Sequence, residues 1–157
     1  MGKYLVVANL TAESPALRAE AASMVSRDPE AEFVVLVPMR TLPPSLALGG
    51  GLDGRLLRRR RATRARARLE SVGARRVSVR LGRTAALPEI ERALREDEFS
   101  AVIISTLPRH LSHWLHLDLP GKVARRHPEL EVRQVIAPYA LYVDEVALTV
   151  AAGTARA

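Results

Sequence analysis

The sequence contains no cysteine, which excludes disulfide bonds, thiol nucleophiles and thiolate metal sites. Only 4% of its 157 residues are aromatic, so a core must consist mainly of aliphatic side chains. No apolar run has the length that a membrane-spanning helix requires, and no cleavage-site pattern follows the short apolar run near the N-terminus. These absences favour a cytoplasmic protein, and the length suits one main domain.

Lysine is also scarce. The chain has 24 basic and 17 acidic residues, a net charge of +7, and its only lysines are Lys3 and Lys122. Such a charge permits binding to nucleic acids or other anionic surfaces but does not establish it. A GC-rich coding sequence also favours arginine over lysine, and this is the simpler explanation.

Apolar segments alternate with amphipathic ones along the chain. Five short runs rich in β-branched residues predict strands, at residues 4–8, 32–37, 77–81, 101–104 and 132–136. Helices are expected from Pro15 to the residue before Asp28, at 56–72, at 86–96 and after Pro120, with Ser14 as an N-cap and Gly73 as a C-terminal cap. This alternation predicts a three-layer α/β/α sandwich with a parallel sheet.

Two segments fall outside this alternation. Residues 39–54 contain three consecutive glycines and read as a long loop. The domain is expected to span 1–137, and 138–157 is expected to be a C-terminal extension, in which 142–150 could form an extra edge or dimer strand. Residues 151–157 are expected to fray.

Sheets of this class bind ligands beyond the carboxyl ends of their strands, where the strand order reverses. The loops to inspect therefore follow the first strand, at residues 8–11, and the fourth strand, at residues 105–110. The second of these loops carries the most informative pattern in the chain.

The order of elements and the loop after the fourth strand resemble the universal stress protein family. Its ATP-binding members have glycine, two residues, glycine, nine residues, then glycine and a serine or threonine. The same spacing here meets Ser105, Pro108, Asp118 and Leu119. The resemblance extends over residues 3–136 and implies a Rossmann-like sheet of five parallel strands in the order 3-2-1-4-5.

All four signature positions differ from the family pattern. Pro108 has no N–H to offer a phosphate, Asp118 would repel one, and Leu119 lacks the hydroxyl. Asn9 and Leu10 stand near the place where the family often has an aspartate. We therefore expect no tight ATP binding and no other cofactor, and we expect Asp118 to cap the helix that begins near Leu119 instead.

Polar side chains in these loops could still form a small anion site, although an ordinary polar loop is the alternative. The candidate ligand-binding residues lie after the first, second and fourth predicted strands: Asn9, Thr11, Pro38, Ser105, Thr106, Arg109, His110 and Asp118. His110, His113 and His116 are spaced by three, which takes the last of them off the face of the others, so no metal site is expected.

Eight arginines stand between Arg55 and Arg68. Arg58, Arg59, Arg60 and Arg61 are the candidates for nucleic-acid binding, but a solvated helix face is the favoured interpretation, because no aromatic residues are interleaved to stack on bases.

The sequence contains no P-loop, no Gly-x-Gly-x-x-Gly and no Gly-x-Ser-x-Gly motif. The leading hypothesis is thus a non-enzymatic, universal-stress-protein-like homodimer with a stress or regulatory role through protein contacts. The alternative is a small-molecule, nucleotide or anion-binding domain with a remodelled site at the ends of strands one and four.

Overall fold

The computed structural model describes residues 1–39, 52–108 and 112–137. Its elements follow the predicted alternation: β1 (Lys3–Val7), α1 (Pro15–Arg27), β2 (Glu32–Val37), α2 (Leu52–Ser71), β3 (Arg76–Leu81), α3 (Ala86–Glu96), β4 (Ala101–Thr106), α4 (His113–His116), α5 (Leu119–Arg126) and β5 (Glu131–Ile136). The extension at 138–157 and most of the predicted loop at 39–54 lie outside the described residues.

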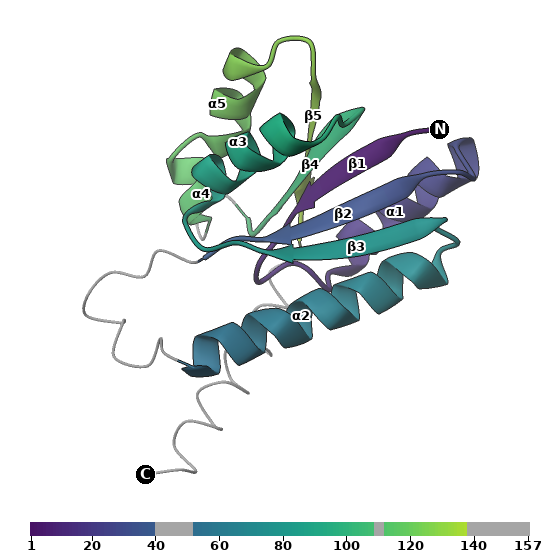
Figure 1. The fold of residues 1–157 in the computed structure, drawn as a ribbon, viewed down its shortest axis with the longest axis horizontal. Coiled ribbons are helices and arrows are strands. Elements are labelled where there is room, and N and C mark those ends of the chain that lie inside the picture. The colour runs from purple at the N-terminus through teal and green to yellow at the C-terminus, as the bar shows by residue number, and fades with distance from the viewer. Residues whose placement is uncertain (40–51, 109–111, 138–157) are drawn as a thin grey trace.

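The five strands form one parallel sheet in the order β3-β2-β1-β4-β5, as the resemblance implied. In the centre, Leu5 of β1 is in register with Val34 of β2 on one side and with Val102 of β4 on the other. The sheet twists strongly, so that β5 runs steeply across the direction of β3 (Figure 1). The strand order reverses between β1 and β4, which places the switch point there.

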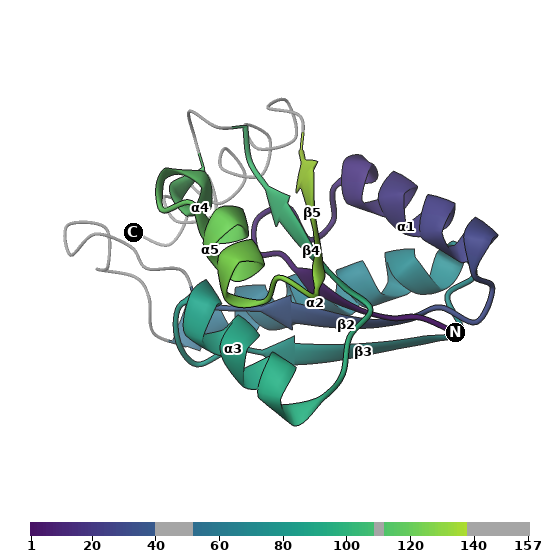
Figure 2. The ribbon, with the colours of Figure 1, turned by 90° about the horizontal axis from the view of Figure 1, so that it is seen from above.

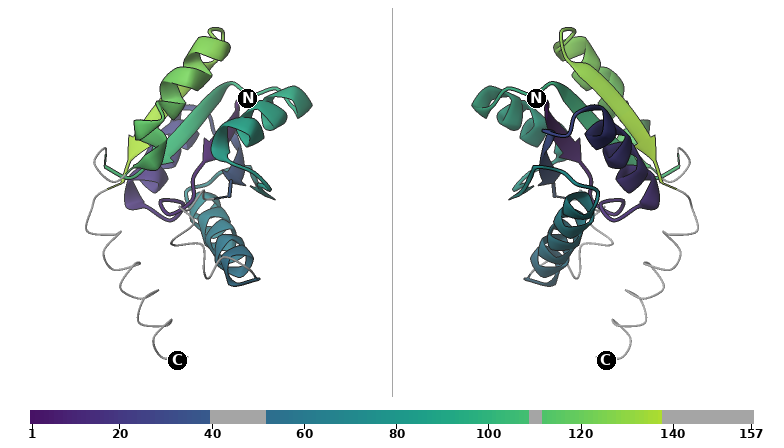
Figure 3. Two further views of the ribbon diagram at one scale, coloured as in Figure 1. Left: turned by 90° about the vertical axis from the view of Figure 1, so that its left-hand side faces the viewer. Right: turned by 90° about the vertical axis from the view of Figure 1, so that its right-hand side faces the viewer.

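Helices cover both faces of the sheet, which makes the predicted three layers (Figures 2 and 3). On one face, the buried side chains of α1 and α2 pack against alternate residues of the strands, among them Val6, Phe33 and Ile103. On the other face, α3 and α5 pack against Leu5, Leu36 and their neighbours. The three central strands are buried on both faces, which explains why they read as continuous apolar runs.

The helix caps follow the local sequence. The hydroxyl of Ser14 accepts a hydrogen bond from the backbone N–H of Leu17 at 3.1 Å, and Pro15 occupies the first turn, as predicted. Gly73 follows α2 with φ of +91°, a conformation that a side chain would strain, so its predicted role as a helix terminator is confirmed.

The prediction for the start of α2 was less accurate. The helix begins at Leu52, before the predicted start at residue 56, and Leu57 is 38% exposed, whereas Ala62, Ala65 and Leu69 are buried. The N-terminal end of α2 projects beyond the carboxyl ends of the strands (Figure 1), so no sheet lies above it. In the described part of the chain, no helix is long and apolar enough to cross a membrane.

Candidate functional site at the switch point

The carboxyl ends of β1 and β4 bring several predicted residues together. Thr11 is buried, and its hydroxyl donates a hydrogen bond of 2.9 Å to the backbone carbonyl of Ser105. This bond ties the loop after β1 to the end of β4, across the line where the strand order reverses. The Thr11 hydroxyl is therefore engaged within the protein and is not directed at open solvent.

Asn9 is also engaged internally. Its side-chain amide donates to the carbonyl of Pro38 at 2.9 Å, which joins the ends of β1 and β2. Its side-chain oxygen accepts a hydrogen bond of 3.0 Å from the guanidinium of Arg61, which reaches in from α2. Three elements are thus joined at one buried amide, and Pro38 participates through its carbonyl alone.

The serine and threonine at the end of β4 differ from these residues. Within the described ranges, the hydroxyls of Ser105 and Thr106 are buried and have no hydrogen-bond partner. Successive side chains of a strand point to opposite faces, so Ser105 shares the face of Ile103 and Thr106 shares that of Ile104. The two free hydroxyls therefore do not converge on one ligand.

The signature positions also have a definite geometry. The first of them, Ser105, belongs to β4, where it is in register with Val135 of β5, and so it does not lie in a loop. Leu119, the first residue of α5, is 4% exposed and packs in the same core cluster as Ile90 of α3, at the position where the family has a hydroxyl for phosphate.

Asp118 occupies the position of the third signature residue in a left-handed conformation, with φ of 51° and ψ of 44°. Such a conformation favours glycine, which is the family residue there, although aspartate tolerates it better than most residues do. The backbone thus keeps the geometry of a glycine at this point, while the side chain has changed.

The predicted capping role of Asp118 was wrong. Asp118 is the N-cap residue of α5 by position, but its side chain makes no capping hydrogen bond. Its carboxylate is 3.0 Å from the guanidinium of Arg125 instead, and both side chains are exposed. A capping side chain requires an extended backbone at the N-cap, which the left-handed conformation does not provide.

Two candidate residues, Arg109 and His110, lie outside the described residues, and so do the side chains of His113 and His116. Among the residues that the structure describes, no three acidic or histidine side chains are grouped so as to hold a metal ion.

The four candidate arginines of α2 separate into two pairs. Arg58 donates to the backbone carbonyl of Gly82 at 2.7 Å, and Arg61 donates to Asn9, so both fasten α2 to the rest of the fold. Arg59 and Arg60 are exposed. Sequence reasoning missed the structural role of Arg58 and Arg61, although their spacing of three places them on one side of the helix.

No protein-family model matches this sequence, and no curated protein is similar to it. Solved structures are similar. A universal stress protein from Archaeoglobus fulgidus has a TM-score of 0.60 at 12% identity, over 86% of this chain and 93% of its own. The chain has the fold of the universal stress proteins.

Two further structures with the universal stress fold agree. A universal stress protein solved in complex with cAMP has a TM-score of 0.57 at 16% identity, over 87% of this chain and 98% of its own. A protein of the family from Burkholderia pseudomallei has a TM-score of 0.52 at 20% identity, over 85% of this chain and 94% of its own. The strand order and the helices on both faces therefore belong to a known architecture, while the residues at the signature positions are this chain's own.

Proposed function

We propose that this chain is a non-enzymatic, universal-stress-like domain that does not hold ATP tightly and acts in the cytoplasm through protein contacts. The hydrogen bond from Thr11 to the Ser105 carbonyl carries the proposal, because it joins the loop after β1 to the end of β4 through groups of the protein itself, at the place where sheets of this class bind ligands. Leu119 supports it further, since an apolar core residue replaces a phosphate-binding hydroxyl.

Electrostatics support the same conclusion. The carboxylate of Asp118 stands at the third signature position and is only partly neutralised by Arg125, because both groups are exposed to solvent. A nucleotide phosphate placed against this carboxylate would be repelled. Within the described ranges, no serine or threonine hydroxyl is hydrogen-bonded to a histidine, as a hydrolytic nucleophile would need to be.

The test is a thermal unfolding experiment with millimolar Mg-ATP, together with nucleotide extraction from the purified protein. A ligand that binds only the folded state raises the melting temperature. We expect no extracted nucleotide and no shift beyond that given by Mg-tripolyphosphate, which controls for the effect of anions on a protein of net charge +7. A shift of several degrees with Mg-ATP alone would overturn the proposal.

A second candidate function rests on Thr106. Its buried hydroxyl lacks a partner in the described part of the chain, and buried hydroxyls are normally hydrogen-bonded. A small anion or nucleotide at the end of β4 could supply the partner. Because one structural neighbour was solved with cAMP, cAMP is the probe to use.

Thr106→Val tests this second function, since the substitution replaces the hydroxyl by a methyl group of similar shape. A cAMP complex that uses the hydroxyl should bind several-fold more weakly to the variant, as measured by calorimetric titration. Equal affinities, or no binding by either protein, would leave the first proposal as the better description.

We also propose that the protein is a homodimer that pairs through the β5 side of the sheet. β5 is an edge strand of the sheet, and exposed strand edges invite pairing. Ile136, at the end of β5, is 52% exposed, which supplies an apolar contact beside that edge.

A further inference from the structure

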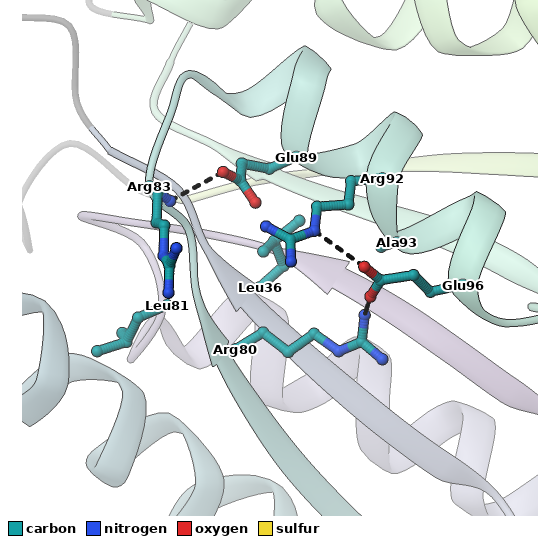
Figure 4. Close-up of a pocket in the computed structure, with 8 residues that line it drawn as sticks. All are labelled: Leu36, Arg80, Leu81, Arg83, Glu89, Arg92, Ala93 and Glu96. Atoms are coloured by element: carbon teal, nitrogen blue, oxygen red, sulfur yellow. Dashed lines mark hydrogen bonds and ion pairs between the residues drawn. The ribbon is translucent and has the colours of Figure 1, made fainter.

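A pocket of about 230 Å³ lies between β3 and α3 (Figure 4). It is at the β3 edge of the sheet, whereas the switch point lies between β1 and β4. Its lining comes from the end of β2, from β3, from the loop after β3 and from one face of α3: Leu36, Arg80, Leu81, Arg83, Glu89, Arg92, Ala93 and Glu96.

The pocket follows from the way the chain crosses the sheet. α3 connects β3 to β4 and packs over the centre of the sheet, where Ile90 and Ala93 contact the cluster around Leu36. The side chains of β3 alternate, so that Val77 and Val79 pack beneath α2 on the opposite face. Arg80 therefore stands on the α3 side of this edge strand, where its guanidinium reaches Glu96 of α3.

Three guanidinium groups surround this space. Arg92 reaches from α3 toward the middle of the pocket, Arg83 descends along the loop side, and Arg80 extends along β3 (Figure 4). The lining carries these three positive charges and only two negative ones, those of Glu89 and Glu96.

Neither carboxylate fully balances the arginines. Glu96 is shared, because Arg80 and Arg92 each lie 2.9 Å from one of its oxygens. Asp97 adds only a contact of 4.0 Å to Arg80. One carboxylate thus serves two guanidiniums at an exposed position.

Glu89 is directed elsewhere. One of its oxygens accepts hydrogen bonds from the backbone N–H groups of Arg83 and Thr84, at 2.8 and 2.9 Å, and from the Thr84 hydroxyl at 3.0 Å. In the described part of the chain, no hydrogen bond or ion pair engages the Arg83 guanidinium, which is exposed. Five N–H donors are therefore available beside the pocket.

We propose that this pocket binds a small molecule through an oxyanion group, either a carboxylate or a phosphate. Guanidinium groups match both groups through paired, charge-assisted hydrogen bonds. Leu36 and Ala93 provide an apolar wall for the remainder of the ligand. The pocket is smaller than the roughly 300–1,000 Å³ of sites for drug-sized ligands, so the ligand is a small metabolite and not a whole nucleotide triphosphate.

The test uses the full chain with inorganic phosphate and acetate as separate probes, titrated at constant ionic strength by calorimetry and by amide NMR. We expect saturable binding of at least one probe, with shifts at the amides of Arg83, Thr84 and residues 92–96. The stronger probe identifies the oxyanion class. No saturable binding of either probe, or shifts confined to α2, would overturn the proposal.

Two charge-changing variants sharpen the test. Arg83→Gln should weaken binding by about tenfold, the usual effect of one charge-assisted contact, whereas Arg95→Gln, on the outer side of α3, should not. Glu96→Gln should strengthen binding, since it frees Arg80 and Arg92 from their shared carboxylate, whereas Glu98→Gln should not. Equal affinities within either pair would overturn the proposal.

The two sites are separable. Loss of phosphate or acetate binding in Arg83→Gln concerns this pocket alone, while stabilisation by Mg-ATP that persists in Arg83→Gln would come from the switch point and would contradict the proposed function alone.

Discussion

Glu89 is a buried charged side chain whose bonds hold the turn between β3 and α3. Burial raises the pKa of its carboxyl, but hydrogen bonds from the backbone N–H of Arg83 and from Thr84 outweigh that effect and leave the pKa below its usual range. The carboxylate also sits near Gly82, where a side chain would meet the backbone of Pro38 at 2.9 Å. The turn is therefore tight and depends on the charge of one residue.

Replacement of this carboxylate should be costly. Glu89→Ala leaves the N–H groups of Arg83 and Thr84 without the acceptor that they have in the half-buried hydrogen bonds of this turn. We expect a loss of about 1.5–3 kcal/mol in the free energy of unfolding, the range for hydrogen bonds to a charged group. Denaturant unfolding measures it, with Glu98→Ala as the exposed control. A loss below about 0.5 kcal/mol, the ordinary scatter of surface substitutions, would contradict this account.

At the switch point, some features of individual residues were predictable from the sequence and others were not. The spacing that leads from Ser105 to Asp118 was informative, because the structure keeps a glycine-like conformation at Asp118. The partner of that carboxylate was not predictable, since the conformation of the backbone decides where a side chain points. The engagement of Thr11 and Asn9 with backbone carbonyls was equally hidden, because those carbonyls belong to distant strands.

Among the elements, α2 combines a structural face with a charged one. Two of its buried residues, Ala62 and Ala65, are small, which lets this part of the helix lie close to the sheet, and Leu69 is buried nearer its C-terminal end. Arg58 and Arg61 then fasten its first half to the ends of β3 and β1. A run of arginine in the sequence therefore contains two residues that hold the fold and two that face solvent.

Two double variants with the same change in charge should separate these roles. Arg58→Gln with Arg61→Gln should lower the free energy of unfolding by about 1–3 kcal/mol, because two charge-assisted hydrogen bonds become weaker or are lost. Arg59→Gln with Arg60→Gln should change it by less than about 0.5 kcal/mol, as surface substitutions usually do. Equal losses in the two variants, measured by denaturant unfolding, would contradict the division.

The same outer pair tests nucleic-acid binding. We expect no salt-dependent gel shift with single-stranded DNA at physiological salt, since α2 has no aromatic side chains among its exposed arginines to stack on bases. If a shift occurs and is lost in Arg59→Gln with Arg60→Gln while the fold remains intact, the expectation is wrong and the outer face of α2 binds phosphate backbones.

The elements themselves were largely predictable. The predicted bounds of β2 and of α3 match those observed. Pro38 marks the end of β2, while Pro88 in the first turn and Asp97 after the last turn mark the two ends of α3. The strand β4 is two residues longer than predicted, since Ser105 and Thr106 are polar but remain paired with β5. The short helix α4 was not assigned, because its four residues are too few to show periodicity.

At the scale of the whole molecule, the outer edge of β5, which no strand among the described residues covers, bears on assembly. If the homodimer forms there, a charge at Ile136 should prevent it. Ile136→Lys should give the mass of a monomer in light scattering at concentrations where the parent chain is a dimer, while Leu117→Lys, at a similarly exposed leucine, should leave the dimer intact. A dimer that persists in Ile136→Lys would place the interface elsewhere.

The stability of the whole molecule should depend on pH in a definite direction. Among the residues that the structure describes, four carboxyl groups have a lowered pKa. A hydrogen bond from the N–H of Gly2 lowers the pKa of Asp28, and the hydrogen bonds described above lower the pKa of Glu89. The pKa of Glu96 is lowered by Arg92, and the pKa of Asp97 is lowered by Lys3. Because the folded pKa lies below the unfolded one, each group stabilises the fold above its unfolded pKa of about 4.

That stabilisation is lost as the pH falls through the folded pKa values, because protons then bind the unfolded chain more strongly than the folded one. We therefore expect a free energy of unfolding that stays nearly constant from about pH 7 to pH 5 and falls steadily below about pH 4.5. Growing positive charge on a chain that already carries +7 adds to the loss. Glu89→Gln should reduce the slope below pH 4.5, whereas Glu98→Gln should not, and stability that rises on acidification would contradict the assignment.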